Sequence, residues 1–323
     1  MNIGPWKSSW TDLIGFSILS LLFYKLGIFF LLFLVPLQVL YVRRGLTTQL
    51  YSFGIVLFFI FVFAVISTRK IENGTLRGTL LLLEMVVPAL LMTGLAAVNA
   101  HNEYIHRNLY KLLAATIITG LVSIVIIVLM MRSEAYINFI KDQMDLMLEA
   151  FSQAFTTEGT AGMMFGGMFT TERIFEMARK ILLRNYLFLY FMMLVGNWRA
   201  GTAIGKRSIG ESVTPFSGFS LPDFFIWPLL ISWTGVLFDS LIGAGFLSYI
   251  FWNSGLVFLF LYGLQGFAII RHLFEKYSVS RGLRFLFGFG VVILFMIPGL
   301  NFLLLIGIPG LGVSELWIKL RKE

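Results

Sequence analysis

The stretch LLAATIITGLVSIVIIVLMM, from Leu112 to Met131, contains no charged side chain. A helix needs about 20 predominantly apolar residues to cross the hydrocarbon core of a bilayer, and this stretch has that length. It therefore predicts a membrane-spanning helix. Because several other stretches of the chain have the same character, the sequence predicts a protein whose main solvent is lipid.

The composition supports this class of protein. Of the 323 residues, 58% are hydrophobic and 13% are charged, and the mean hydropathy is +0.86. In soluble domains about a quarter of the residues are charged, so a water-soluble domain of ordinary size is excluded. The sequence has no cysteine, which excludes disulfides, thiolate metal sites and cysteine nucleophiles. The net charge of +8 fits basic loops beside anionic headgroups better than nucleic-acid binding.

The apolar segments predict an all-α fold, a polytopic transmembrane helix bundle of about eight spans. The first two segments form either a tight hairpin or one long broken helix. The last is interrupted at Pro298–Gly299 and forms a kinked helix or a half-span hairpin. The segments are Leu13–Tyr24, Leu26–Val42, Leu50–Ser67, Leu80–Val98, Leu112–Met131, Ile181–Trp198, Phe224–Phe238, Phe251–Ile270 and Leu283–Leu311.

One segment has a different pattern. In Ala135–Thr156 the apolar residues recur at helical spacing and the charged residues fill the opposite face, which predicts an amphipathic helix. Such a helix lies on a membrane surface or covers the bundle. The glycine-rich apolar segment Gly162–Phe169 follows and is expected to dip into the bilayer or cover a cavity. Thr171 is then expected to cap the next helix, and a basic loop with Arg199 and Lys206 is expected to follow that helix.

These segments predict an N-terminal transmembrane bundle over 1–131, an interfacial region over 132–178 and a C-terminal transmembrane bundle over 179–323, joined in one membrane domain. Lysines and arginines prefer cytoplasmic loops. Strict alternation then places the basic loops inside and the region 132–178 outside. The basic C-terminus, predicted as a short helix over Ser314–Lys322, prefers the inside, which requires the last segment to return as a hairpin.

Glu84 is the first candidate ligand-binding residue, because a carboxylate within an apolar span costs about 2.5–3.5 kcal/mol at mid-depth. It is either a ligand or proton site, or an interfacial residue paired with Lys70 or Arg77. Asp239 is buried in the bundle if its helix continues through Ser240 toward Tyr249, and it is an ordinary interfacial aspartate if the helix ends at Phe238.

Two amides complete the candidate ligand-binding set. Asn253 and Gln265 are twelve residues apart, so they lie on roughly one face of a helix. Such amides either line a solute pocket or bridge helices within a bundle.

No motif indicates an enzyme or a cofactor. His101 and His106 flank Glu103 on a short loop, with a spacing that suits no standard zinc site. The segment GTAIGKRS, which starts at Gly201, departs from the phosphate-binding pattern at Ala200 and Arg207. No serine, histidine and aspartate set converges. We therefore expect no catalytic residues, no metal and no cofactor.

Four pieces of the chain resemble the YybS-like family of uncharacterised bacterial membrane proteins (domain of unknown function 2232). They are the turn at Arg43–Gly45, the motif FSGFSLPDFFIWPLL (Phe216–Leu230), the segment with Asn253, Gly263 and Gln265–Gly266, and the ending PGLGVSELWIKLRK (Pro309–Lys322). The family is distantly similar to the S-components of energy-coupling-factor transporters, which are small helical bundles that bind a vitamin or metal and dock onto a coupling protein.

The resemblance implies a multi-pass protein of the bacterial cytoplasmic membrane that binds or transports a small, unidentified solute. The alternative is a non-catalytic interaction or regulatory subunit of a larger assembly. The expected partners are the lipid bilayer and another membrane subunit, with no nucleic acid.

Overall fold

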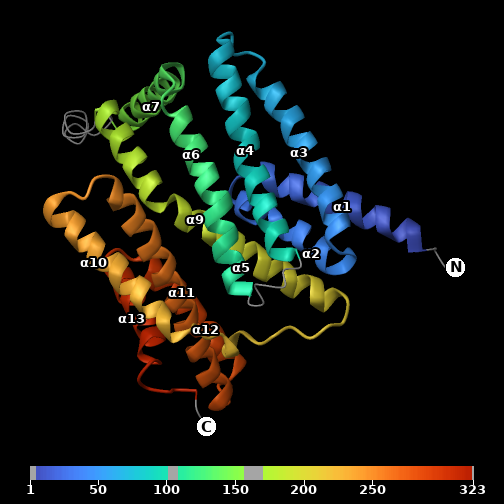
Figure 1. Ribbon diagram of the computed structural model, residues 1–323, viewed down its shortest axis with the longest axis vertical. Coiled ribbons are helices and arrows are strands. Elements are labelled where there is room, and N and C mark those ends of the chain that lie inside the picture. Colours follow the sequence, from blue (N-terminus) through green and yellow to red (C-terminus); the bar gives the residue numbers. More distant parts are fainter. Residues whose placement is uncertain (1–4, 101–107, 156–169, 322–323) are drawn as a thin grey trace. The chain divides into compact units, whose positions relative to one another are not determined.

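The computed structural model of the protein describes residues 5–100, 108–155 and 170–321. The described residues form helices joined by short connections, with no strand among them. They divide into two compact units, Met1–Ser212 (unit 1) and Val213–Glu323 (unit 2) (Figure 1). The predicted regions 1–131, 132–178 and 179–323 concern placement in a membrane and stay a prediction, whereas the packing of the chain divides it after Ser212.

Seven helical segments of the described chain are long and apolar enough to cross a membrane, which confirms the predicted all-α polytopic architecture. Asn301–Ser314 is a shorter apolar helix. The seven segments are Gly27–Arg44, Leu46–Thr68, Gly74–Asn99, Asn108–Met130, Thr171–Ser208, Asp223–Ile242 and Phe246–Lys276.

The N-terminal segments form a tight hairpin, the first of the two predicted alternatives. Helix α1 (Pro5–Lys25) turns back through a 3-10 helix, Gly27–Leu32, into α2 (Leu34–Arg44). Gly27 has φ +54, a left-handed conformation that glycine adopts without strain. Ser20 Oγ donates to the carbonyl oxygen of Phe33 at 2.7 Å, which joins the two helices near the turn. At their other ends an Arg44 nitrogen lies 2.8 Å from Asp12 Oδ2.

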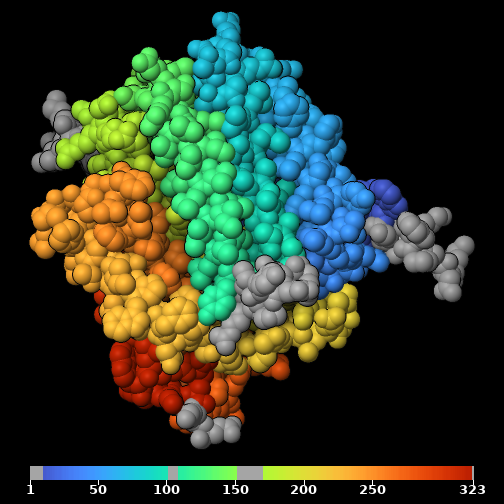
Figure 2. Space-filling view, viewed as in Figure 1, coloured from blue at the N-terminus to red at the C-terminus, as the bar shows by residue number. Residues whose placement is uncertain are grey.

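Helix α3 (Leu46–Thr68) and helix α4 (Gly74–Asn99) pack next to this hairpin. The stretch Leu112–Met131 belongs to one interrupted helix, formed by α5 (Asn108–Ala115), a π-helical turn (Thr116–Gly120) and α6 (Leu121–Met130). Figure 2 shows α4 between α3 and this interrupted helix on one face of unit 1.

The long helix α9 (Thr171–Ser208) corrects the prediction of a basic loop after Trp198. The cap is Thr170, one residue before the predicted Thr171, and its Oγ1 accepts a hydrogen bond from the backbone nitrogen of Arg173 at 3.4 Å. The helix continues to Ser208 because its last turns pack closely on α2.

Gly201 and Gly205 make this close packing possible. A Cβ atom at Gly201 would lie 2.4 Å from Gln38 Cβ, and one at Gly205 would lie 2.7 Å from Val42 Cβ. The two residues form a G-x-x-x-G pattern, which lets helix backbones approach each other within membranes. The segment GTAIGKRS, which partly matches the phosphate-binding pattern, is therefore a helix-packing surface.

Helix α7 (Glu134–Phe155) confirms the predicted amphipathic helix. Ile137, Ile140 and Met144 are half-buried, and Lys141 Nζ lies 2.6 Å from Glu172 Oε2 of α9. Met147 breaks the pattern, because 73% of its surface is exposed. The predicted lid over Gly162–Phe169 lies outside the described residues.

Unit 2 contains α10 (Ile226–Ile242), α11 (Phe246–Lys276), α12 (Arg281–Met296) and α13 (Asn301–Ser314). The predicted interruption at Pro298–Gly299 is present as a break between α12 and α13, where Gly299 has φ +89. α13 packs tightly along α11: a Cβ atom at Gly266 would lie 2.0 Å from the carbonyl oxygen of Ile308. The predicted terminal helix Ser314–Lys322 is wrong, because α13 ends at Ser314 and the chain then turns.

Candidate functional site

The predicted site residues belong to both units. Glu84 belongs to unit 1, whereas Asp239, Asn253 and Gln265 belong to unit 2. Within unit 2 each of the three is bonded to different partners.

Glu84 lies ten residues after Gly74, the first residue of α4. Its carboxylate oxygen Oε2 is buried and has no hydrogen-bond partner among the described residues. No ion pair joins it to Lys70 or Arg77 in the described structure, so the predicted pairing is absent. Tyr24 of α1 donates its hydroxyl to the backbone carbonyl oxygen of Glu84 at 3.3 Å, which brings an aromatic side chain against this part of α4.

Asp239 holds the turn between α10 and α11. Its Oδ1 accepts the backbone N–H of Ala244 at 2.9 Å, and its Oδ2 accepts the Ser248 hydroxyl at 2.7 Å. Gly243 and Gly245, at φ +70 and +55, supply the backbone conformations that the turn needs. α10 therefore ends three residues after Asp239, and the carboxylate serves the connection.

Asn253 and Gln265 are both buried in α11. Asn253 Nδ2 donates to the carbonyl oxygen of Tyr249 in its own helix at 2.7 Å. Gln265 joins three parts of unit 2: Oε1 accepts the N–H of Leu221 at 2.8 Å, while Nε2 donates to the Gly312 carbonyl at 3.0 Å and to Glu315 Oε2 at 2.9 Å. The interpretation of these amides as bridges therefore fits Gln265.

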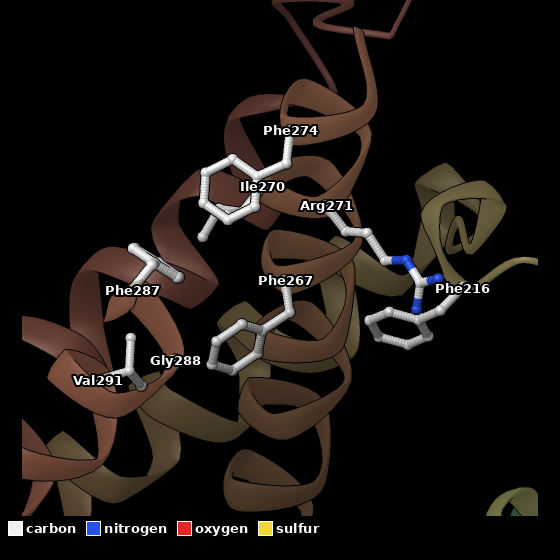
Figure 3. A pocket seen from close by; sticks show the side chains of 8 residues that line it. All are labelled: Phe216, Phe267, Ile270, Arg271, Phe274, Phe287, Gly288 and Val291. Atoms are coloured by element: carbon white, nitrogen blue, oxygen red, sulfur yellow. The ribbon is translucent and has the colours of Figure 1, made fainter. Parts of the chain in front are cut away.

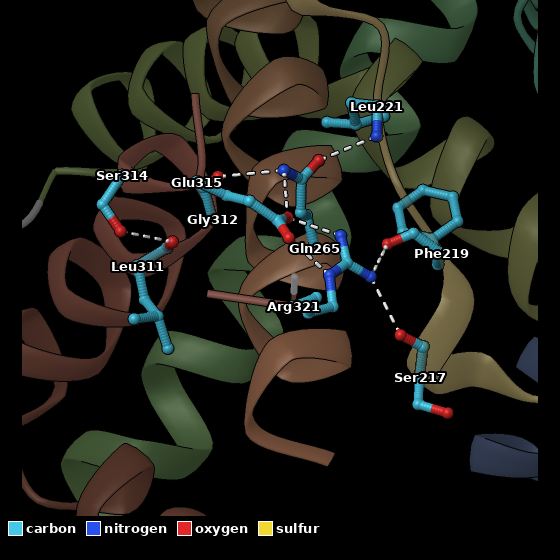
Figure 4. A network of polar contacts seen from close by, with 9 residues as sticks. All are labelled: Ser217, Phe219, Leu221, Gln265, Leu311, Gly312, Ser314, Glu315 and Arg321. Atoms are coloured by element: carbon cyan, nitrogen blue, oxygen red, sulfur yellow. Dashed lines mark hydrogen bonds and ion pairs between the residues drawn. The ribbon is translucent and has the colours of Figure 1, made fainter. Parts of the chain in front are cut away.

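An ion pair extends this network (Figure 4). Arg321 is bonded through two nitrogens to both oxygens of Glu315, and each side chain is 14% exposed. The same guanidinium donates to the carbonyl oxygens of Ser217 and Phe219, at 2.9 and 2.8 Å. These bonds explain why the chain after Ser314 turns back and does not continue as a helix.

Three of the segments that carry the family resemblance meet in this network. Ser217, Phe219 and Leu221 come from the motif Phe216–Leu230, Gln265 from the α11 segment, and Glu315 and Arg321 from the C-terminal ending. Most of the donors and acceptors named here are used by one another. The network therefore fixes the connections of unit 2 and leaves little capacity for a ligand.

Sequence reasoning missed a second polar cluster, in unit 1. Gln38 and Asn99 exchange hydrogen bonds at 3.1 and 2.7 Å, Asn99 Nδ2 also donates to Gln49 Oε1 at 3.1 Å, and Gln38 Nε2 donates to Thr202 Oγ1 at 3.0 Å. Gln38 and Gln49 are 1% and 0% exposed. The signal in the sequence for this cluster is the presence of amide side chains within or beside predicted spans, because such groups need hydrogen-bond partners inside a membrane.

An apolar groove of about 380 Å³ lies between α11 and α12. Phe267, Ile270 and Phe274 line its α11 side, and Phe287 and Val291 line its α12 side (Figure 3). Arg271 extends from α11 toward Phe216 (Figure 3). The volume of the groove is within the range of about 300–1,000 Å³ that is typical of small-ligand sites.

Among the described residues, no group of three or more histidine, aspartate or glutamate side chains is arranged to hold a metal ion. His101, Glu103 and His106, the loop considered as a zinc site, lie outside those residues.

The family model for predicted membrane proteins named DUF2232 matches residues 14–310 of the chain. This range includes the second half of α1, all of α2, Glu84, the amide cluster and most of unit 2. No curated protein and no solved structure matches the chain.

Proposed function

Because the chain belongs to the DUF2232 family of predicted membrane proteins, we propose that it is a non-enzymatic membrane protein that binds and carries a small solute in the manner of an S-component. The observation that carries the proposal is the carboxylate of Glu84. Its buried Oε2 lies in an apolar helix and lacks a hydrogen-bond partner among the described residues. Glu84 is the residue to which we assign solute binding.

A buried carboxylate without a partner is energetically costly. Burying an unpaired polar or charged group is unfavourable, and buried charges are normally paired. In unit 1 neither Lys70 nor Arg77 supplies that pairing, although both lie near the start of α4 in the sequence. A bound solute with a positive charge or a hydrogen-bond donor would satisfy Oε2, so the expected ligand is a small cationic or donor-rich molecule, or a metal cation.

The proposed location is the bacterial cytoplasmic membrane, with the basic ends of the helices inside. The helical hairpin α12–α13 supports this orientation, because it returns the chain toward the end of α11 at which Lys276 lies. Lys319 and Arg321 then share a side with Lys276 and Arg281.

A thermal-shift screen tests the proposal with the full chain in mild detergent. The panel contains water-soluble vitamins and divalent cations, each at a concentration well above the expected Kd. A ligand at 100 times its Kd stabilises the folded state by about 2.7 kcal/mol. We expect at least one compound to stabilise the wild type and the Glu72→Gln variant but not Glu84→Gln. Glu72 is an exposed carboxylate just before α4 and serves as the matched control.

Either of two outcomes would contradict the proposal. The first is that no compound stabilises the wild type. The second is that Glu84→Gln responds to the active compound as strongly as Glu72→Gln does, because the carboxylate then takes no part in binding.

The second candidate function is a regulatory subunit of a larger membrane assembly. It is favoured by α7, where Leu146 and Met147 are 59% and 73% exposed on a helix outside the candidate spans. Purification in mild detergent followed by mass spectrometry of co-eluting chains tests it. A stoichiometric partner that is lost in Leu146→Gln/Met147→Gln would support this function, whereas recovery of the chain alone would count against it.

A further inference from the structure

We propose that the groove between α11 and α12 binds one anionic phospholipid, with an acyl chain in the groove and the phosphate at the basic turn that joins the two helices. All residues of this site belong to unit 2, whereas Glu84 belongs to unit 1. The site therefore does not depend on the proposed solute-binding function.

The groove exists because α12 stands away from α11. No residue of α12 is buried, and its packing partner in unit 2 is α13. The two helices meet near the turn, where the rings of Phe274 and Phe287 contact each other edge to face with centroids 5.2 Å apart. Arg284 fastens the start of α12 to the end of α11, because it donates to the carbonyl oxygens of Phe274 and Val279 at 2.9 Å each. The groove is the space between the two helices that continues from this contact away from the turn.

The lining of the groove suits a hydrocarbon chain. Phe267, Ile270 and Phe274 lie at helical spacing on one face of α11, and they span two turns, about 10 Å of helix. Phe287 and Val291 face them from α12 (Figure 3). No side chain in this set offers a hydrogen bond, so a polar solute would lose its hydration without compensation.

The charge at one end of the groove suits a phosphate. Between residues 271 and 284 the chain carries four lysine or arginine side chains, namely Arg271, Lys276, Arg281 and Arg284, and one acidic side chain, Glu275. Arg271 is paired with Glu275 at 3.0 Å, and Arg284 is held by backbone carbonyls. Lys276 and Arg281 are exposed and have no ion pair among the described residues, so they are available to an anionic headgroup.

This combination selects an anionic amphiphile over the other occupants of a membrane. A helix of a partner protein would fill the groove but leave Lys276 and Arg281 without anions. A zwitterionic lipid would fill it with a weaker electrostatic contribution. Basic pockets between transmembrane helices on the cytoplasmic side are the sites at which anionic headgroups bind, and the charge bias of the sequence predicts that this turn is cytoplasmic.

Native mass spectrometry of the full chain in detergent tests the proposal. Phosphatidylglycerol and phosphatidylcholine with the same acyl chains are added separately, and inorganic phosphate is added in a third arm. We expect one phosphatidylglycerol molecule to bind in preference to phosphatidylcholine. The double variant Lys276→Gln/Arg281→Gln should weaken that binding about twenty-fivefold, since each basic group near an anionic surface contributes about fivefold. Arg69→Gln/Lys70→Gln, which removes two exposed charges at the end of α3, should retain it.

A second pair of variants tests the groove itself. Gly288 lines the groove, whereas Gly290 does not, and a Cβ atom at either would meet nothing within 4 Å. Gly288→Leu should fill the groove and abolish the preference for phosphatidylglycerol, whereas Gly290→Leu should keep it. If Gly288→Leu fails to fold, the double charge variant decides alone.

Four results of the lipid-binding measurements would overturn the inference. They are equal binding of the two lipids, unchanged binding in Lys276→Gln/Arg281→Gln, unchanged binding in a folded Gly288→Leu variant, and full competition by inorganic phosphate. A protein partner that binds to the wild type, is lost in Gly288→Leu and resists displacement by lipid would overturn it as well.

Discussion

Gln38 of α2 and Asn99 of α4 exchange hydrogen bonds in both directions, with Nε2 to Oδ1 at 3.1 Å and Nδ2 to Oε1 at 2.7 Å. The pair also bonds to Gln49 of α3 and Thr202 of α9. Four helices of unit 1 therefore meet at one set of amide and hydroxyl groups. In an apolar bundle this cluster fixes which helix faces are adjacent, because any other register leaves amides unpaired.

Replacement of Asn99 by alanine tests the importance of the cluster. Asn99→Ala removes the partner of two buried amides, Gln38 and Gln49, so we expect a loss of about 1–3 kcal/mol of stability. Reversible unfolding in mixed micelles measures the change. Asn185→Ala is the control, since Asn185 is a half-buried residue of α9 that bonds to Ile181 in its own helix. A loss in Asn99→Ala no larger than that in Asn185→Ala would show that the cluster is dispensable.

The contact between α2 and α9 depends on two glycines. Gly201→Ala places a Cβ atom 2.4 Å from Gln38 Cβ and 2.9 Å from the Val35 carbonyl oxygen, so the helices must move apart. We expect destabilisation of about 1–3 kcal/mol from overpacking, although alanine has the higher helix propensity. Gly196→Ala on the same helix meets nothing within 4 Å and should be neutral or stabilising. Equal midpoints in a thermal melt of the two variants would contradict this packing.

The ion pair in unit 2 provides a double-mutant cycle. Arg321→Met leaves Glu315 unpaired in a position where it is 14% exposed, so we expect a loss of about 3–5 kcal/mol. The double variant Glu315→Leu/Arg321→Met should lose less than the sum of the two single variants, because neither charge is then left without its partner. Arg179→Met, which breaks an exposed pair with Glu176, should cost less than about 1 kcal/mol. Additive losses in the cycle would mean that Glu315 and Arg321 act independently.

Variants of Asp239 test whether this carboxylate has a structural role or binds the ligand. Asp239→Ala removes the acceptor for Ala244 N–H and Ser248 Oγ, and should cost about 1–3 kcal/mol. Asp239→Asn keeps one carbonyl oxygen in place and should lose less. Both variants should keep the ligand-dependent thermal shift of the wild type. Loss of that shift in a folded Asp239→Asn variant would assign this carboxylate to the binding site.

The sequence predicts the helical architecture well, because span length and hydrophobicity follow directly from the thickness of a bilayer. The stretch Leu112–Met131, the amphipathic α7 and the break at Pro298–Gly299 are all found where the pattern places them. The extent of α9 was wrong because its basic residues resembled a loop, whereas tertiary packing of Gly201 and Gly205 on α2 keeps the segment helical. The C-terminal turn was missed because it depends on bonds from Arg321 to residues about one hundred positions earlier.

The candidate site was predicted less completely. Glu84 is a candidate from the sequence because a carboxylate in an apolar span is unusual, and only the structure shows that its Oε2 lacks a hydrogen-bond partner among the described residues. The roles of Asp239 and Gln265 depend on the turn at Gly243 and on contacts with Leu221 and Gly312, none of which periodicity reveals. The groove between α11 and α12 arises from the spacing of two helices, which hydrophobic patterning does not specify.

A cryo-EM map of the full chain in lipid nanodiscs, with the compound that stabilises it, tests the central claim about Glu84 most directly. The account predicts non-protein density within about 3 Å of Glu84 Oε2, at hydrogen-bond distance. Glu84 paired with a lysine or arginine of the chain, or ligand density at a site remote from α4, would contradict it.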